Sequence, residues 1–195
     1  MANNTPEDRE ARVEIIAAHF QEILETLGET PREGIEGTPQ RFARMYMDEI
    51  YCSGDPLEEE LSTVFVEPTR AREMIVLRDL PIISYCEHHT LPYFGKAHVG
   101  YIPRNNIIGL SKVARLVIAA SRGLTIQERV TDRVADALVK VLNPIGVAVV
   151  TDCVHTCMVV RGVKSYTAST TISAIRGLFM ENEAARAEFF AMVKR

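Results

Sequence analysis

The sequence has few cysteines, no long apolar run and no excess of positive charge. Its 22 lysines and arginines stand against 26 aspartates and glutamates, which gives a formal net charge of −4 at pH 7. Nucleic-acid binding generally needs a basic surface, so this balance argues against a nucleic-acid partner. No apolar stretch approaches the roughly 18 residues of a membrane-spanning helix, and the first residues lack the pattern of a secretion signal. We therefore expect no membrane partner.

The four cysteines do not resemble a disulfide framework, because three of them lie within a few residues of a histidine. Cysteine grouped with histidine favours a metal site, and free thiols suit a reducing compartment. We therefore expect a cytoplasmic protein. At 195 residues, of which 47% are hydrophobic, the chain is long enough for one sizeable domain and a small helical appendage.

Two short windows, Ser84–Thr90 and Cys153–Cys157, hold three of the four cysteines and three of the five histidines. Cys86 and His89 have the C-x2-H spacing that lets one turn present two side chains to a single ion. With Cys157 they make a set of two thiolates and one imidazole. Zinc takes such ligands tetrahedrally, and a catalytic zinc keeps three protein ligands and one open position. The pattern therefore favours a catalytic zinc site.

Two further histidines, His88 and His155, lie beside these ligands in the sequence and would remain as acid–base groups. A metal ion with acid–base groups next to it is the arrangement typical of a hydrolytic site. Taken singly, each thiol is equally well explained as a buried core residue, and the histidine pair as a surface feature. A structural zinc that recruits Cys153 as a fourth ligand is a third interpretation.

Apolar periodicity and turn signals predict the order of the elements. Helices are expected to begin at Thr5-Pro6, Thr38-Pro39, Ser111, Thr125 and Asn182. Strands are expected over 63–66, 74–85, 97–102, 147–160 and 166–175. Strands, then two consecutive helices, then strands indicate an α+β fold rather than an alternating parallel fold.

Two helix starts carry specific expectations. Ser111 is expected to cap its helix, and Thr125 and Glu128 have the spacing of a capping box. This capping box would give Glu128 a complete structural explanation. In the strand that follows, an unbroken course to residue 160 would place His155 and Cys157 on one face.

Basic residues also occur near helix starts, at Lys112 and Arg115 and again at Arg41 and Arg44. Helix N-termini attract phosphates through free backbone N–H groups and the helix dipole, and basic side chains strengthen that attraction. A solvated basic face is nevertheless the commoner explanation for such pairs. From the residues alone, both interpretations stay open.

At six motifs, the sequence resembles the GTP cyclohydrolase I family over nearly the whole chain. The residues that carry the resemblance are Gly37–Arg41, Cys86–His89, Gly109–Lys112 with Arg115, Gln127–Arg129, His155–Cys157 and Arg161–Gly162. The resemblance implies the tunnelling fold, an antiparallel sheet backed by two helices, with an N-terminal helical extension. It places that extension at residues 1–55 and the catalytic domain at residues 56–195. It also implies a homodecamer, a dimer of pentamers, with each active site at a subunit interface.

By the same resemblance, the enzyme converts GTP and water to 7,8-dihydroneopterin triphosphate and formate, the first step of pterin and tetrahydrofolate biosynthesis. Cys86, His89 and Cys157 resemble the family's ligands to Zn2+, which would activate water for attack on C8 of guanine. His155 resembles the acid that protonates the imidazole ring of guanine, and His88 a second proton-transfer group.

The resemblance assigns the remaining site residues to GTP binding. Glu128 resembles the carboxylate that anchors guanine, and Gln127 assists it, partly through its backbone. Residues that resemble the triphosphate contacts are Ser111, Lys112, Arg115 and Arg161, together with Arg41 and Arg44 from another subunit. Cys153 is not one of the family's ligands, and we interpret it as a packed thiol.

Two other functions fit part of the pattern. A zinc nucleoside deaminase also uses Cys/His ligands and a carboxylate, but its H-x-E and P-C-x-x-C motifs are absent from the sequence. A ligand-binding or scaffolding member of the same fold would be expected to lack His155 or a metal ligand, and none is missing. Formate release from GTP separates the three, because a deaminase releases ammonia and a scaffold releases nothing.

Overall fold

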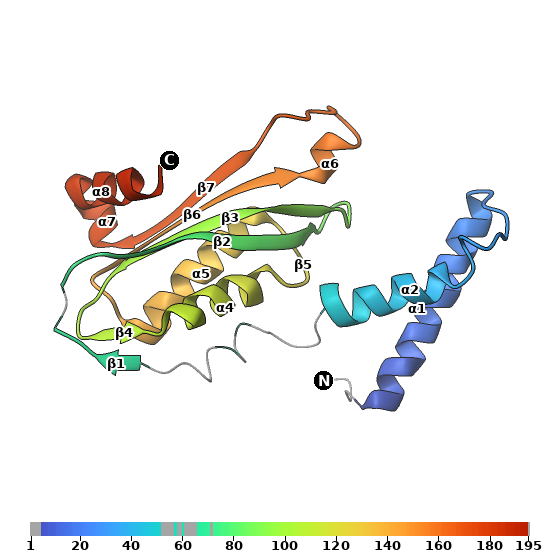
Figure 1. Cartoon of the computed structure of the whole chain (residues 1–195), viewed down its shortest axis with the longest axis horizontal. Coiled ribbons are helices and arrows are strands. Elements are labelled where there is room, and N and C mark those ends of the chain that lie inside the picture. Colours follow the sequence, from blue (N-terminus) through green and yellow to red (C-terminus); the bar gives the residue numbers. More distant parts are fainter. Residues whose placement is uncertain (1–4, 52–56, 58–59, 61–65, 71, 195) are drawn as a thin grey trace. The chain divides into compact units, whose positions relative to one another are not determined.

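The computed structural model describes residues 5–51, 57, 60, 66–70 and 72–194 (Figure 1). The chain divides into two compact units, Met1–Gly54 and Asp55–Arg195. Among the described helices, none combines the length and the apolar character needed to cross a membrane.

The first unit is helical and begins as the sequence predicts. In α1 (Pro6–Thr26), Thr5 is the N-cap residue, and its hydroxyl accepts a hydrogen bond of 3.1 Å from the backbone N–H of Asp8. A second helix, α2 (Thr38–Met45), passes into a π-helical turn, η1 (Tyr46–Ile50). The two helices pack through a small core and a stacked ring pair, Phe20 and Phe42, whose centroids lie 3.8 Å apart.

The second unit is built on a five-stranded sheet with the order β5-β2-β3-β6-β7. The strands are β2 (Ile75–Cys86), β3 (Pro92–Ile102), β5 (Leu124–Thr125), β6 (Gly146–His155) and β7 (Thr170–Gly177). Every pairing is antiparallel except that of β5 with β2. Two short strands, β1 (Val66–Pro68) and β4 (Asn106–Ile108), pair separately. Most of the strand expected over 63–66 lies outside the described residues.

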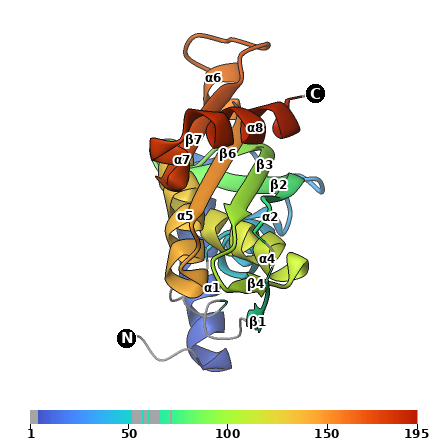
Figure 2. The ribbon, with the colours of Figure 1, turned by 90° about the vertical axis from the view of Figure 1, so that its left-hand side faces the viewer.

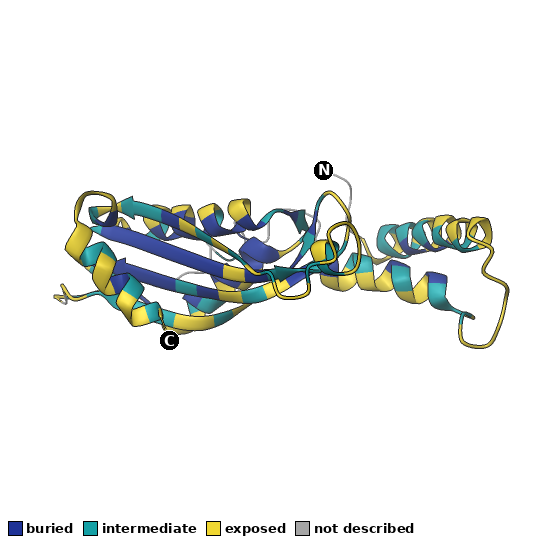
Figure 3. Ribbon diagram, turned by 90° about the horizontal axis from the view of Figure 1, so that it is seen from above, coloured by how far each residue is buried: buried dark blue, intermediate teal, exposed yellow. Residues whose placement is uncertain are grey.

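Helices cover both faces of this sheet (Figure 2). On one face, α4 (Leu110–Ser121) and α5 (Gln127–Leu142) bury their apolar stripes, and Val130, Val134 and Leu138 are fully buried. On the other face, α7 (Leu178–Glu181) and α8 (Glu183–Val193) pack Phe179 and Phe189 against the strands. Buried residues concentrate along the central strands (Figure 3). The expected α+β class is thus present, as a mainly antiparallel sheet with helices on both faces.

The two capping predictions are wrong. Helix α4 starts one residue before Ser111, with Gly109 as its N-cap. The N-cap of α5 is Ile126, because Thr125 pairs with Cys86 as the last residue of β5 and is held in the sheet. The capping-box explanation of Glu128 therefore disappears.

The long strand expected over 147–160 is also wrong. Strand β6 ends at His155, and the chain enters a helical turn, α6 (Thr156–Val159). The backbone N–H of Val160 closes this turn on the carbonyl of Thr156 at 2.9 Å, while the Thr156 hydroxyl donates to the carbonyl of Pro92 at 2.5 Å. Cys157 therefore leaves the sheet, and strand alternation no longer sets its direction.

Candidate metal centre and active site

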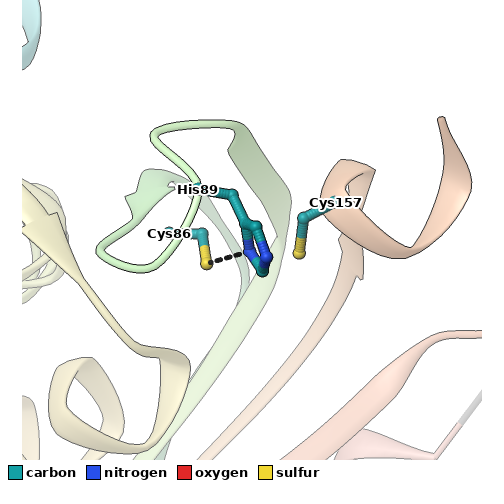
Figure 4. Close-up of side chains that lie close together, drawn as sticks. All are labelled: Cys86, His89 and Cys157. Atoms are coloured by element: carbon teal, nitrogen blue, oxygen red, sulfur yellow. Dashed lines mark hydrogen bonds between the residues drawn. The ribbon is translucent and has the colours of Figure 1, made fainter. Parts of the chain in front are cut away.

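Three side chains from two distant segments meet at one end of the sheet. The ligand atoms of Cys86, His89 and Cys157 all lie within 4.8 Å of one another. Figure 4 shows Cys86 at the end of β2, His89 in the turn that follows, and Cys157 approaching from α6. Within the described residues, this is the group of cysteine, histidine and acidic side chains placed to hold a metal ion.

Local backbone structure explains why Cys86 and His89 converge. Cys86 is the last residue of β2, and a tight turn follows it. The N–H groups of His89 and Thr90 both donate to the carbonyl of Cys86, at 3.2 and 2.8 Å. Thr90 has a φ of 55°, in the left-handed region, which lets the chain reverse into β3. The C-x2-H spacing therefore works through a turn rather than through one face of a strand.

The donor set suits zinc. Zinc–sulfur bonds of about 2.3 Å and zinc–nitrogen bonds of about 2.0 Å place tetrahedral ligand atoms roughly 3.5–3.8 Å apart. The Sγ of Cys86 lies 3.5 Å from Nδ1 of His89, in this range. Burial raises the pKa of the Cys157 thiol, and the neighbouring Cys86 raises it further. A thiol whose ionisation is disfavoured in this way, beside a second sulfur, is one that a bound cation would stabilise as a thiolate.

His155, the last residue of β6, lies between a ring and an amide. Its imidazole stacks on Tyr93 with centroids 4.8 Å apart and planes 13° from parallel. Its Nε2 lies 2.8 Å from Oε1 of Gln127. Burial lowers the pKa of His155, and the negative charge of Glu128 partly opposes that shift. Glu128, the residue expected to bind guanine, therefore affects the pKa of His155, the residue expected to transfer a proton.

The second histidine, His88, is exposed, and its Nδ1 lies 3.8 Å from Sγ of Cys86. Arg161 follows α6, and its Nη1 lies 2.8 Å from Nε2 of His89. The structure thus places one of the arginines expected to bind phosphate beside a predicted metal ligand.

The other predicted phosphate contacts of this unit lie on α4. Ser111 and Arg115 are exposed, and Nζ of Lys112 lies 3.7 Å from a carboxylate oxygen of Glu60. Ser111 and Lys112 also line a cavity of about 570 Å3, which extends to Tyr101 beneath them.

The two arginines of the first unit are engaged locally. Arg41 donates to the carbonyl of Glu36 at 3.0 Å and to the hydroxyl of Thr38 at 2.7 Å. Arg44 forms a bidentate ion pair with the carboxylate of Glu10. Their expected contact with a triphosphate bound to another subunit stays a prediction.

Comparison with known proteins identifies the family. The model of the family described as GTP cyclohydrolase I matches residues 16–194. A protein named GTP cyclohydrolase 1 from Desulforamulus reducens is 50% identical over 175 residues, covering 89% of this chain and 92% of its own. The chain belongs to the GTP cyclohydrolase I family.

Further relatives extend the match to the full length. The GTP cyclohydrolase 1 of Pelotomaculum thermopropionicum is 51% identical over 176 residues, covering 88% of this chain and 92% of its own. That of Corynebacterium aurimucosum is 42% identical over 197 residues and covers 100% of both chains. Among solved structures, the apo form of the archaeosine synthase QueF-Like aligns with 55% of this chain and 97% of its own, at 16% identity and a TM-score of 0.46. The predicted family membership is confirmed by the sequence matches.

Sequence reasoning missed an ion pair that joins two of the family motifs. Arg129, in the first turn of α5, donates from Nη1 to Oε2 of Glu87 at 2.5 Å and from Nη2 to Oε1 at 3.4 Å. Arg129 accordingly holds the pKa of Glu87 below its usual value. The pair ties the loop that carries Cys86 and His89 to the helix that carries Glu128. Both residues stand inside quoted motifs, but nothing in their spacing predicts the contact.

Proposed function

We propose that this protein is a zinc-dependent GTP cyclohydrolase that converts GTP and water to 7,8-dihydroneopterin triphosphate and formate. The observation that carries the proposal is the convergence of Cys86, His89 and Cys157 within 4.8 Å, in a chain that belongs to this family. His155 lies two residues from Cys157, at the end of β6. The product is the starting point of pterin and tetrahydrofolate biosynthesis.

Cys86, His89 and Cys157 would hold the zinc ion. When bound, zinc supplies Lewis-acid activation of water for hydrolysis at C8 of guanine. A three-residue ligand set leaves one coordination position for the reaction. Cys153 is fully enclosed in the core, which supports a packing role for it rather than a fourth ligand.

We assign proton transfer to His155 and His88. His155 would protonate a nitrogen of the guanine imidazole ring, because imidazole titrates near neutral pH and can both give and take a proton. His88 is exposed beside Cys86 and would move a second proton. Glu128, exposed in the first turn of α5 and without a capping-box partner, would anchor guanine by accepting its N1–H and exocyclic amine.

Charge complementarity supports the triphosphate assignment. Ser111, Lys112 and Arg115 gather near the N-terminus of α4, where free N–H groups favour anions, and Arg161 lies beside the metal ligands. The family resemblance adds Arg41 and Arg44 from another subunit, and Gln127 as a further contact for guanine. Neutralising a triphosphate needs several cations, so this division between subunits is chemically reasonable.

We further propose the assembly that the resemblance implies. Residues 1–55 would form the helical extension and residues 56–195 a catalytic domain with the tunnelling fold. β5 and β7 are the outer strands of the sheet. Outer strands offer unpaired backbone groups, so edge-to-edge pairing of subunits into pentamers, and of pentamers into a homodecamer, would cover them. The free thiols at the metal centre favour a reducing compartment such as the cytoplasm.

The direct test is to incubate the zinc-loaded protein with GTP and measure formate, ammonia and the pterin product together. Formate and a fluorescent oxidised pterin in equal amounts are the expected result. Ammonia without formate would instead indicate a deaminase. Zinc binding with neither product would indicate a scaffold that has kept the metal site.

A further inference from the structure

Gln127 is the most completely enclosed amide beside the site. Only 1% of its surface is exposed, although it stands in the first turn of α5 beside the exposed Glu128. Its Nε2 lies 2.9 Å from the carbonyl oxygen of Thr170 and 3.2 Å from that of Thr151. Its Oε1 lies 2.8 Å from Nε2 of His155. Because the nitrogen and the oxygen of this buried amide both have hydrogen-bond partners, those partners determine which way the amide is oriented.

The partners of Gln127 allow one orientation. A carbonyl oxygen can only accept a hydrogen bond, so the group that faces the carbonyls of Thr151 and Thr170 must be the NH2. The amide oxygen is then the atom that faces His155. Because that oxygen can only accept, Nε2 of His155 must carry a hydrogen and donate it. The tautomer of His155 thus follows from backbone carbonyls on two neighbouring strands.

Buried hydroxyls extend this chain of hydrogen bonds away from the site. Nε2 of Gln127 also donates to the hydroxyl of Thr151 at 2.9 Å, and that hydroxyl lies 2.9 Å from the hydroxyl of Thr131. The Thr131 hydroxyl donates back to the backbone carbonyl of Gln127 at 2.8 Å. Both threonines are fully buried. The single proton of Thr131 is used on that carbonyl, so Thr151 donates to Thr131 and accepts from Gln127.

A ring contact fixes the plane of the imidazole as well. Tyr93 pairs with His155 across β3 and β6, is fully buried and stacks on the imidazole almost in parallel. Rotating the imidazole by half a turn would exchange its ring nitrogens and carbons and break the bond to Gln127. Stacking sets the plane, and the amide sets which nitrogen carries the fixed hydrogen.

We propose that Gln127 is a positioning residue that holds His155 in the tautomer with hydrogen on Nε2, so that His155 exchanges its catalytic proton only through Nδ1. This inference deepens the proposed function and rests on it for its catalytic meaning. In the cationic form both nitrogens carry hydrogen. Nδ1 gives its proton to the guanine ring nitrogen, which leaves neutral His155 with the Nε2–H bond to Gln127 intact. Water then returns a proton to Nδ1.

The same contacts bear on how Gln127 meets the substrate. Its two N–H groups are shared among three acceptors of the protein, and its oxygen accepts from His155. The side chain therefore has no donor to offer guanine, and any contact with the base comes from its main chain. Loss of the side chain should accordingly lower kcat rather than raise KM.

Two variants and one matched control test this role. Gln127→Met keeps the length of the side chain and removes its hydrogen bonds, while Thr151→Val removes a hydroxyl that holds the amide. Ser121→Ala removes another fully buried hydroxyl, which donates to the carbonyl of Val117 within α4, and serves as the control. Zinc content and thermal unfolding show whether each variant is folded and loaded.

Two readouts separate positioning from a purely structural role. The first is the 15N chemical shifts of the His155 ring nitrogens in zinc-free and zinc-loaded protein labelled on histidine. The second is the division between kcat and KM for formate release. For Gln127→Met we expect a mixture of tautomers and a kcat lower by about 10–100-fold, with KM within about threefold. Thr151→Val should change both readouts in the same direction, and Ser121→Ala neither.

A neutral wild-type His155 whose single ring N–H is on Nδ1 rather than on Nε2 would overturn the proposal. So would a Gln127→Met variant with raised KM and unchanged kcat, since that result would mean that the side chain binds guanine. Equal losses of kcat in Thr151→Val and Ser121→Ala would also contradict the proposal, because they would show that loss of any buried hydroxyl lowers kcat through general destabilisation. If the wild-type protein releases no formate, the proposed function fails, and the nitrogen shifts still decide the tautomer.

Discussion

The contact between Phe189 and Gly100 offers a quantitative test of how α8 is attached to the sheet. Phe189 is fully buried and packs edge-on against Phe179, with centroids 5.9 Å apart. It lies directly over Gly100 of β3. A Cβ added at Gly100 would stand 2.6 Å from Cδ2 and 2.7 Å from Cε2 of the Phe189 ring, closer than carbon atoms can approach. The aromatic ring therefore requires the absence of a side chain beneath it.

Each single substitution should destabilise the protein. A phenylalanine buries roughly 150–250 Å2, which at about 25 cal/mol per Å2 corresponds to about 4–6 kcal/mol. Replacing a buried phenylalanine by alanine generally costs about 3–5 kcal/mol, and we expect a loss in this range for Phe189→Ala. Gly100→Ala forces the ring aside, and overpacking of this kind costs about 1–3 kcal/mol.

The double variant should be more stable than the sum of the single effects predicts. Without the ring, the nearest neighbour of the new methyl group of Gly100→Ala is Cγ2 of Val76, at an ordinary 3.6 Å. We expect a coupling free energy of about 1–3 kcal/mol between the two sites. Urea unfolding at one fixed protein concentration measures it, because self-association would otherwise shift apparent stability. Additivity within about 0.5 kcal/mol would show that Phe189 does not pack over Gly100.

Two further predictions follow from buried titratable groups. Burial holds the pKa of His98 below its ordinary value of 6.5, partly opposed by Asp79, whose N–H donates to Nδ1. The unfolded chain therefore takes up this proton first, and stability present above the ordinary pKa is lost as pH falls through the folded pKa. Between about pH 7 and pH 5.5, unfolding free energy should fall more steeply in the wild type than in His98→Asn, and parallel curves would refute this. Burial also raises the pKa of Cys153 to about 12. Iodoacetamide should therefore modify Cys157 in the zinc-free protein and leave Cys153 intact, as peptide mass spectrometry would show; modification of Cys153 at a similar rate would contradict its burial.

Much of the fold could be predicted from local signals. Thr5, followed by proline and two acids, caps α1 as its sequence indicates. The stripe of Val130, Val134 and Leu138 is buried along α5 as its period requires. In such segments, the residues that determine the structure lie within a turn of one another, so the local sequence is enough to predict it.

Local signals failed where a distant strand decided the outcome. Thr125 and Glu128 have the spacing of a capping box, but Thr125 pairs with Cys86, 39 positions away, and stays in the sheet. The β-branched run around Cys157 favours a strand, yet the bond from Thr156 to Pro92 holds the chain in a helical turn. Neither partner can be inferred from nearby residues.

The candidate site likewise has features that local sequence predicts and features that depend on distant residues. The spacing of Cys86 and His89 predicted their convergence, because one turn holds both. The role of Gln127 could not be predicted, since its partners Thr151 and His155 lie 24 and 28 positions away and meet it only through the sheet.

The most direct test of the metal centre is zinc content and formate release from GTP, measured together on the wild type and three variants. We expect stoichiometric zinc and turnover in the wild type, and the loss of both in Cys157→Ser. Cys153→Ser, the matched cysteine control, should keep both, and His155→Ala should keep zinc without turnover. If Cys157→Ser retains zinc and activity while Cys153→Ser loses them, the ligand set is wrong and the account of this site fails.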